Sequence, residues 1–306
     1  MRTATMRAIY EAAKRDESIY FLTGDYGKAF MDMFREDIPD QVMNLGMAEQ
    51  NLIGVAAGLA LSGKKVFVYS IVPFVTLRCL EQLKVDVCYH NLDVTVVGVG
   101  GGFVYGSCGV THLSIEDIAV MRSLPNMKIV APANPMEATL LTNEIIRVGG
   151  PAYIRLNKAN ELDPPTRYPV IFGRPFVAKS GTDVTVVSTG AMLETALKVA
   201  QKLELKGLST EVLHMHTLKP FNADSIKTRA NHRECIITIE EHSIIGGLGS
   251  CVAEAFAEAA PNKAVFKRFG IKDVWPHVVG TQQFLRDHAG LSPEAIVAEV
   301  FNLMCL

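Results

Sequence analysis

Short runs rich in valine and isoleucine alternate with longer segments of helical pattern along the first half of the chain. This alternation is typical of a parallel sheet whose connecting helices cover both faces. It predicts strands over 19–23, 41–44, 65–69, 94–99, 128–131 and 152–156. It predicts helices over 3–14, from 49 onwards, and over 77–90, 115–122 and 135–147. We therefore expect an α/β domain with a mainly parallel sheet over residues 1–163.

A stretch marked by four prolines follows this domain: Pro164, Pro165, Pro169 and Pro175. Proline interrupts regular structure, so residues 164–180 are expected to form a linker or a crossover arm. Further strand patterns occur at 184–188, 210–214, 235–240 and 265–268, again separated by helical segments. They predict a second, smaller α/β domain over residues 181–306. A chain of 306 residues with 49% hydrophobic content can bury two such cores.

The composition argues against nucleic-acid and membrane partners. The formal net charge is −2 and charges of both signs are interspersed, so no basic footprint or membrane-surface patch is indicated. The N-terminus lacks an apolar signal core, and the longest uncharged stretch, 94–111, is interrupted by glycines and does not resemble a membrane span. Six cysteines show neither a Cys-x-x-Cys pair nor metal-ligand spacing, as expected of reduced thiols in a cytoplasmic protein.

One acidic residue, Glu49, lies in a run from 45 to 61 that otherwise carries no charge. The bulky and small apolar residues of this run predict a buried helix. Burial disfavours the charged form of a carboxyl group, so Glu49 could hold a proton and donate a hydrogen bond in acid–base catalysis. Alternatively, Glu49 could begin the helix and interact with its dipole and exposed amides. The spacing by itself favours the second interpretation.

Five blocks of sequence, however, occur together in one order. They are Gly-Met-Ala-Glu-Gln-Asn (46–51), Gly-Ser-Cys-Gly-Val-Thr-His (106–112), 114–127, Met-His-Thr-Leu-Lys-Pro (215–220) and Glu-Glu-His-Ser-Ile-Ile-Gly-Gly-Leu-Gly-Ser (240–250). In this order they resemble the pyrimidine-binding and C-terminal domains of the transketolase family. The resemblance covers nearly the whole chain and implies a transferase of carbohydrate metabolism that uses thiamine diphosphate and Mg²⁺.

The resemblance implies roles for three residues near the cofactor. In such enzymes a glutamate hydrogen-bonds the pyrimidine nitrogen remote from the thiazolium ring and promotes loss of the C2 proton, and Glu49 occupies the matching position. Phe74 best matches the phenylalanine that stacks on the pyrimidine, although core packing is the alternative. Asp25 aligns with an aspartate near the pyrimidine at a subunit contact; otherwise it is a turn residue beside glycines.

The resemblance also implies substrate contacts. His112 matches a catalytic histidine that lines the substrate channel and binds sugar hydroxyls or phosphate. Arg155 and Lys158 lie where the family places a cation for the substrate phosphate. The guanidinium of Arg155 could form two parallel hydrogen bonds with the phosphate, whereas Lys158 aligns more closely with the family's position. Either residue could instead be a surface cation. Cys108 stands where many transketolases carry an acidic residue, so an atypical sugar, such as a branched or modified one, is expected.

The chain lacks the Gly-Asp-Gly motif through which these enzymes hold the diphosphate and Mg²⁺. It therefore resembles only the C-terminal half of a transketolase, and we expect no metal ligand in it. A partner, the N-terminal transketolase subunit, would carry the diphosphate-binding domain, and two copies of each chain would form a heterotetramer. The expected reaction transfers a two-carbon ketol unit from a ketose, usually phosphorylated, to an aldose. Alternatives are a 1-deoxyxylulose-5-phosphate synthase-like enzyme, a 2-oxo acid dehydrogenase E1 β-like subunit, or a non-catalytic paralogue.

Overall fold

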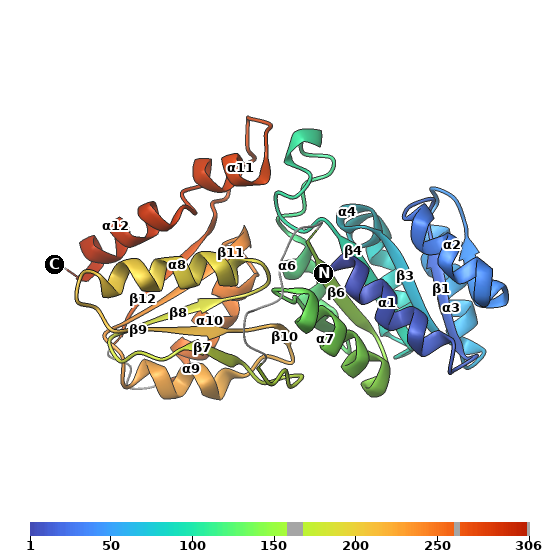
Figure 1. Cartoon of the computed structure of the whole chain (residues 1–306), viewed down its shortest axis with the longest axis horizontal. Coiled ribbons are helices and arrows are strands. Elements are labelled where there is room, and N and C mark those ends of the chain that lie inside the picture. The colour runs from blue at the N-terminus through green and yellow to red at the C-terminus, as the bar shows by residue number, and fades with distance from the viewer. Residues whose placement is uncertain (158–167, 260–263, 305–306) are drawn as a thin grey trace. The chain divides into compact units, whose positions relative to one another are not determined.

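The computed structural model describes residues 1–157, 168–259 and 264–304 and divides into two compact units (Figure 1). Unit 1 consists of Met1–Gly101 and Val120–Arg167, and unit 2 consists of Gly102–Ala119 and Tyr168–Leu306. Lys158, one of the two candidate phosphate-binding cations, lies outside the described residues. Each unit is built around its own sheet with helices on both faces.

The sheet of unit 1 is parallel, in the order β5-β6-β4-β3-β1-β2. Its strands are β1 (Ile19–Thr23), β2 (Val42–Asn44), β3 (Lys65–Ile71), β4 (Val94–Val99), β5 (Lys128–Val130) and β6 (Ala152–Leu156). Every residue of β4 and β6 is buried, because helices cover both faces of the central strands. The predicted strands therefore occur where the valine-rich runs indicated, with ends shifted by at most two residues.

The main helices of unit 1 are α1 (Arg2–Ala13), α2 (Lys28–Asp37), α3 (Glu49–Leu61) and α7 (Pro135–Val148), and α6 (Asp117–Ser123) spans the division between the units. Helix α3 buries one face only, contrary to the expectation of a fully buried helix. Leu52, Ile53 and Ala56 face the core, whereas Gly54 and Gly58 are exposed. Its apolar composition did not reveal which face the sheet covers.

The helix predicted over 77–90 is found as a run of short helical segments that ends at Cys88. The chain forms α4 (Val72–Val75), a 3₁₀ turn η2 (Leu77–Cys79), α5 (Leu80–Gln82) and a π-helical segment η3 (Leu83–Cys88). Thr76 Oγ1 donates a hydrogen bond to the carbonyl oxygen of Val72 at 2.7 Å. Such back-bonding bends helices, and α4 ends after one turn. The short turns bring Phe74 and Arg78 close to each other.

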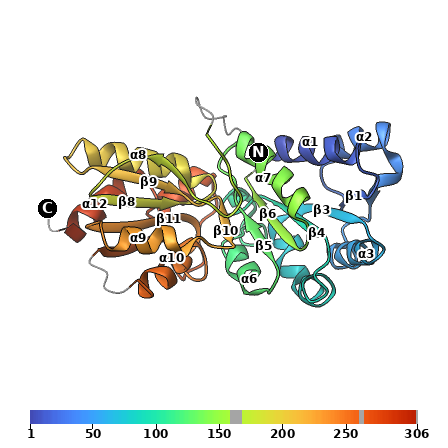
Figure 2. The same cartoon turned by 90° about the horizontal axis from the view of Figure 1, so that it is seen from below.

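Unit 2 has a five-stranded sheet in the order β12-β11-β8-β9-β7, in which only β7 runs antiparallel. Its strands are β7 (Phe176–Lys179), β8 (Val184–Ser188), β9 (Thr210–His214), β11 (Cys235–Ser243) and β12 (Val265–Ile271); β10 (Thr217–Lys219) is a short strand after β9. Its helices are α8 (Met192–Glu204), α9 (Ala223–Ala230), α10 (Leu248–Ala257), α11 (Gln282–His288) and α12 (Pro293–Met304). Helix α8 lies on one side of the sheet, and α9 with α10 on the other (Figure 2). The α/β fold class with mainly parallel sheets is thus confirmed.

Residues 102–119 leave β4 and belong by their contacts to unit 2. We call this segment the 102–119 loop. Its ends are paired: the Gly102 amide donates to the Ser114 carbonyl at 2.7 Å, and the Ser114 amide donates to the Gly102 carbonyl at 3.2 Å. A short 3₁₀ turn, η4 (Gly106–Cys108), lies between them. The loop carries two of the candidate substrate residues, Cys108 and His112.

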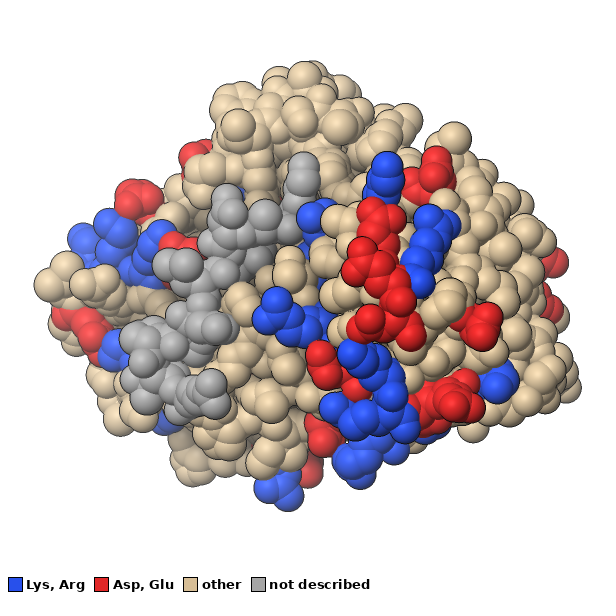
Figure 3. Space-filling view, turned by 45° about the vertical axis from the view of Figure 1, so that its right-hand side comes forward, with Lys and Arg blue, Asp and Glu red and all other residues tan. Residues whose placement is uncertain are grey.

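Within the described ranges, no helix has both the length and the apolar character needed to cross a bilayer. The face shown in Figure 3 carries acidic and basic side chains next to one another, as the interspersed charges of the sequence suggested.

Candidate functional site

Glu49 is the first residue of α3, and only 4% of its side chain is exposed. Gly46, with a φ of +74°, turns the chain into this helix. The unpaired amides and the dipole of a helix N-terminus favour negative charge at this position. Parts of both interpretations drawn from the sequence therefore hold, because Glu49 begins the helix and its side chain is also buried.

The charged partner of Glu49 is Arg78, which the sequence analysis missed. Arg78 Nη1 lies 2.7 Å from Glu49 Oε2, and its own side chain is about half exposed, at 47%. Gln50 Nε2 donates a hydrogen bond to the Arg78 carbonyl oxygen at 3.1 Å, which ties the start of α3 to η2. The available signal was a single arginine within the otherwise uncharged segment 71–80.

Phe74 contacts the same guanidinium group. Arg78 Cζ is 4.4 Å from the centre of the Phe74 ring, a cation–π distance. Cys79 Sγ donates to the Phe74 carbonyl oxygen at 3.2 Å. Burial raises the pKa of the Cys79 thiol to about 12, and the Glu49 carboxylate acts in the same direction. Glu49, Phe74 and Arg78 form what we call the Glu49 cluster.

Asp25 lies next to the turn that precedes Glu49. Its backbone has a φ of +57°, and its amide donates to Asn44 Oδ1 at 2.9 Å. The same oxygen accepts the Gly46 amide at 3.0 Å, and Asn44 Nδ2 donates to Asp25 Oδ1 at 3.3 Å. Asn44, at the end of β2, thus joins the Asp25 loop to the Gly46 turn, and the sequence analysis did not identify it.

Gly24 is packed closely against the turn that precedes Glu49. A Cβ atom added there would lie 3.0 Å from the Gly46 carbonyl oxygen and 3.7 Å from Glu49 Oε1. The first distance is tighter than an ordinary contact, so a side chain at Gly24 would require the Gly46 turn to shift. The glycine therefore lets its own backbone lie close to the Gly46 turn and to Glu49.

Arg155 is in β6 and is buried, so it is not a surface cation. Its guanidinium packs against the backbone at Gly101, where an added Cβ would lie 2.6 Å from Arg155 Cζ. In register, Arg155 pairs with Gly98 of β4. Ligands of α/β sheets bind outside the carboxyl ends of the parallel strands, and Arg155 is next to the last residue of β6.

His112 and Cys108 occupy the middle of the 102–119 loop in unit 2. His112 is half-buried; its Nδ1 lies 2.9 Å from Thr111 Oγ1, and its ring meets the Tyr105 ring edge-on at 6.3 Å between centres. Cys108 is exposed at the end of η4. The structure thus groups the site residues into the Glu49 cluster with Asp25 and Arg155 in unit 1, and the loop pair in unit 2.

Two family models match the chain over nearly its whole length. Residues 1–162 match the transketolase pyrimidine-binding domain, and residues 175–296 match the transketolase C-terminal domain. The chain belongs to the transketolase family. The family resemblance of the sequence blocks is therefore confirmed.

Several relatives of this transketolase-family chain are proteins of similar length. An apulose-4-phosphate transketolase subunit of Phocaeicola vulgatus is 36% identical over 292 residues, which cover 94% of this chain and 92% of that protein. The 6-deoxy-6-sulfo-D-fructose transketolase subunit SqwH of Clostridium sp. strain MSTE9 is 34% identical over 300 residues, covering 97% and 92%. A solved split gene transketolase, described as an inactive beta4 tetramer, has a TM-score of 0.86 at 34% identity and covers 100% of this chain and 98% of its own.

The residues of the Glu49 cluster fit the pyrimidine half of thiamine diphosphate. A buried carboxylate and an aromatic ring are groups that an aminopyrimidine requires for hydrogen bonding and stacking. The sequence offers no matching Gly-Asp-Gly motif for the diphosphate and its metal. The family to which the chain belongs implies thiamine diphosphate as the cofactor.

Proposed function

We propose that this chain is the component of a split transketolase that binds the pyrimidine half of thiamine diphosphate. The reaction is transfer of a two-carbon ketol unit from a ketose to an aldose. The observation that carries the proposal is the buried Glu49 carboxylate at the start of α3, in a domain that matches the pyrimidine-binding model. Burial at a helix start positions one carboxyl group for directional hydrogen bonding.

Each residue of the Glu49 cluster has a task in this proposal. When bound, thiamine diphosphate supplies the electron sink for ketol transfer. Glu49 hydrogen-bonds the pyrimidine ring, and Phe74 stacks on it, an interaction of about 0.5–1.5 kcal/mol beyond burial. Asp25 fixes the turn before Glu49 through its bonds with Asn44. Arg78 holds Glu49 in place from the exposed side.

The substrate is proposed to be an atypical ketose, usually phosphorylated. The relatives named above carry apulose-4-phosphate and 6-deoxy-6-sulfo-D-fructose in their names, which supports this choice. Cys108 offers no carboxylate to a sugar hydroxyl, which favours a substrate other than the usual pentose phosphate. His112 would bind sugar hydroxyls, and Arg155, with Lys158 as the alternative, would bind the anionic end of the substrate.

A partner chain is proposed to hold the diphosphate and Mg²⁺. Two relatives are named as subunits of transketolases, which implies at least one other polypeptide in those enzymes. A solved split gene transketolase is described as an inactive beta4 tetramer. The names support a second subunit, and the proposed working unit has two copies of each chain. In this proposal a chain that binds the pyrimidine ring leaves the diphosphate of the cofactor to be bound by the partner.

Calorimetry tests the division of the cofactor site. The native complex, purified from source cells through a tag on this chain, should bind thiamine diphosphate with Mg²⁺ tightly, whereas the isolated chain should bind weakly. Tight binding by the isolated chain would defeat the split-site proposal.

The role of Glu49 is tested separately by substitution. In the complex, Glu49→Gln should lower kcat for ketol transfer by at least about 100-fold, because an amide cannot shuttle the proton. Its far-ultraviolet circular dichroism and assembly should be unchanged. The exposed Glu81→Gln, in α5, is the matched control and should keep full activity. A fully active Glu49→Gln complex contradicts the proposal.

A further inference from the structure

A second buried carboxylate, Glu241 in β11, lies in unit 2 and has no part in the cofactor site described above. It is 4% exposed. Its Oε1 accepts the Phe103 amide at 2.6 Å and Gln282 Nε2 at 2.8 Å. Its Oε2 accepts Arg286 Nε at 2.6 Å, and Arg286 Nη2 forms an ion pair with the same oxygen. One side chain therefore joins the beginning of the 102–119 loop to helix α11.

The backbone of the loop is shaped to meet this carboxylate. Gly102 has a φ of +70°, and a Cβ atom added there would lie 2.5 Å from Glu241 Oε1. A residue with a side chain at this position would be strained and would also displace the carboxylate. The close approach allows the next amide, that of Phe103, to reach Oε1 directly.

The rest of the loop is fixed to unit 2 at further points. Gly106 packs against Leu285 of α11, since a Cβ there would lie 2.3 Å from Leu285 Cδ1. At the other end, the Ser243 amide donates to the Ile115 carbonyl at 2.6 Å, and the Ala119 amide donates to His242 Nε2 at 3.3 Å. Cys108 and His112 lie between these fixed points.

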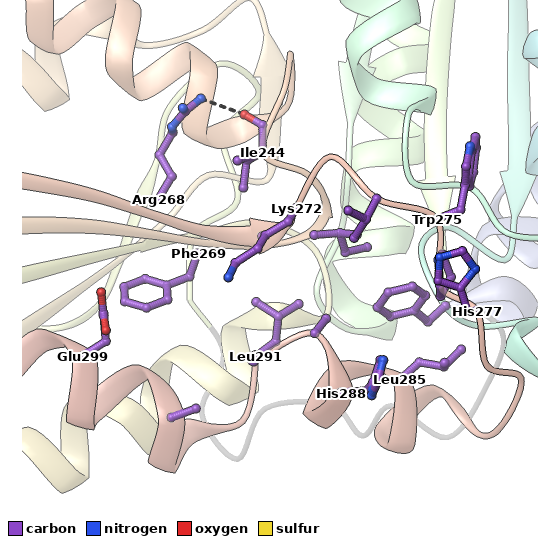
Figure 4. A pocket seen from close by; sticks show the side chains of 18 of the residues that line it. Ile244, Arg268, Phe269, Lys272, Trp275, His277, Leu285, His288, Leu291 and Glu299 are labelled. Carbon is purple, nitrogen blue, oxygen red and sulfur yellow. Dashed lines mark hydrogen bonds between the residues drawn. The ribbon is translucent and has the colours of Figure 1, made fainter.

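Helix α11 is held by polar bonds to the Glu241 carboxylate in addition to apolar packing. It has seven residues, of which only Leu285 is buried. Beside it lies a cavity of about 660 Å³, lined also by Phe269, Leu291 and Phe103 (Figure 4). Leu285 and His288 line this cavity, so on that side the helix is not closely packed. The bonds of Gln282 and Arg286 to Glu241 secure α11 against β11.

We propose that Glu241 is a positioning residue for the substrate side chains of the 102–119 loop. Through Phe103 and α11 it holds the loop in the conformation that presents His112 and Cys108. The C-terminal domain would thereby act on substrate binding without touching substrate. This inference rests on the proposed function for the roles of His112 and Cys108, but the anchoring itself does not.

The neighbouring Glu240 provides a matched control. It is equally buried in β11, but its oxygens accept the amides of Leu248 and Gly249, each at 2.7 Å, at the start of α10. Glu240→Gln and Glu241→Gln therefore change a carboxyl group to an amide at adjacent positions of one strand. The Glu241 change acts on a group bonded directly to the Phe103 amide, whereas Glu240 approaches the loop through His242, whose Nδ1 lies 3.8 Å from Glu240 Oε2 and whose Nε2 accepts the Ala119 amide.

Hydrogen–deuterium exchange tests the anchor independently of any activity. In the isolated chain, Glu241→Gln should speed exchange of amides in 103–116 at least tenfold, whereas Glu240→Gln should speed exchange mainly in 246–252. Gln282→Ala removes the two hydrogen bonds from Gln282 Nε2 to the Glu241 oxygens, at 2.8 and 3.0 Å. It is the milder variant if Glu241→Gln fails to fold. Unchanged exchange over 103–116 in the folded variants overturns the proposal, whether or not the chain is a transketolase.

Kinetics of the native complex test the consequence for substrate. Glu241→Gln should raise KM for the ketose at least tenfold and leave the Kd for thiamine diphosphate within twofold. Arg286→Lys, which retains the charge, should restore most of the affinity lost in Arg286→Ala. A faster-exchanging loop with an unchanged KM would overturn the positioning role. Failure of the proposed function itself would appear differently, as an absence of ketol transfer by the unmodified complex.

Discussion

Arg78 Nη1 lies 2.7 Å from Glu49 Oε2, although 29 residues separate the two in the chain. The carboxylate is buried, whereas the arginine side chain is about half exposed, at 47%. The pair therefore connects the interior at the start of α3 with the surface at η2. The Phe74 ring lies 4.4 Å from the arginine Cζ, so the orientation of the aromatic ring and of the carboxylate depends on one side chain.

Removing the arginine should cost stability through the carboxylate left behind. Arg78→Gln should lower the free energy of unfolding by about 1–3 kcal/mol, because Glu49 would be buried without its charged partner. A double-mutant cycle with Glu49→Gln, measured by urea unfolding, should give a coupling of about 1 kcal/mol or more. The exposed pair Arg15 and Glu11, 3.9 Å apart, is the control and should couple by less than about 0.5 kcal/mol. Additive effects of the two changes would show that the pair does not interact in solution.

Substitution by alanine should weaken cofactor binding at Gly24 but stabilise the fold at Gly54. Gly24→Ala places a Cβ 3.0 Å from the Gly46 carbonyl oxygen and should weaken binding of thiamine diphosphate to the native complex several-fold. Gly54→Ala, in α3, meets no atom of the described residues within 4 Å and should raise the free energy of unfolding by about 0.5–1 kcal/mol. Calorimetry and urea unfolding measure the two effects. Equal cofactor affinity in Gly24→Ala and the unmodified protein would show that close packing at Gly24 does not affect the cofactor site.

Thiol labelling should distinguish one cysteine from the buried ones. In a Cys305→Ser background, a water-soluble disulfide reagent should modify one thiol per native chain at pH 8. That thiol is Cys108, which is exposed, whereas burial raises the pKa of Cys79 to about 12 and that of Cys235 to about 11. Adding Cys108→Ser should abolish the fast phase, and all remaining thiols should react only after unfolding. A fast phase that survives this substitution would contradict the structure.

Titration of Asp16 should make the free energy of unfolding of unit 1 depend on pH in the acidic range. The hydroxyl of Ser18, with Lys65, lowers the pKa of this carboxyl group to about 2. Because the folded-state pKa lies below the unfolded value of about 3.9, the stabilisation is complete above pH 4 and is lost as the pH falls toward 2. Asp16→Asn should thus lower the free energy of unfolding at pH 6 by no more than about 1 kcal/mol, since the side chain is 38% exposed. The difference should shrink below pH 4; an equal difference at pH 6 and pH 3 would refute this origin.

The strands and the position of Glu49 could be predicted from local sequence. The ranges 19–23, 94–99, 152–156, 184–188 and 210–214 coincide with observed strands. A strand buried on both faces needs a continuous run of apolar residues, and such a run is visible without knowledge of its neighbours. Strand β7 and helix α2 were missed, because β7 at the sheet edge is only partly buried and α2 begins after a glycine-containing turn.

What the sequence by itself determined was which segments are strands, that a lone carboxylate begins a helix, and which family the motifs resemble. Tertiary structure decided that Arg78 pairs with Glu49, that Asn44 joins Asp25 to Gly46, and that the 102–119 loop is held by Glu241. The physical reason is that burial periodicity is a property of a few consecutive residues. A hydrogen bond between residues that are distant in the chain, such as Phe103 and Glu241, exists only once the strands and turns have brought the two groups together.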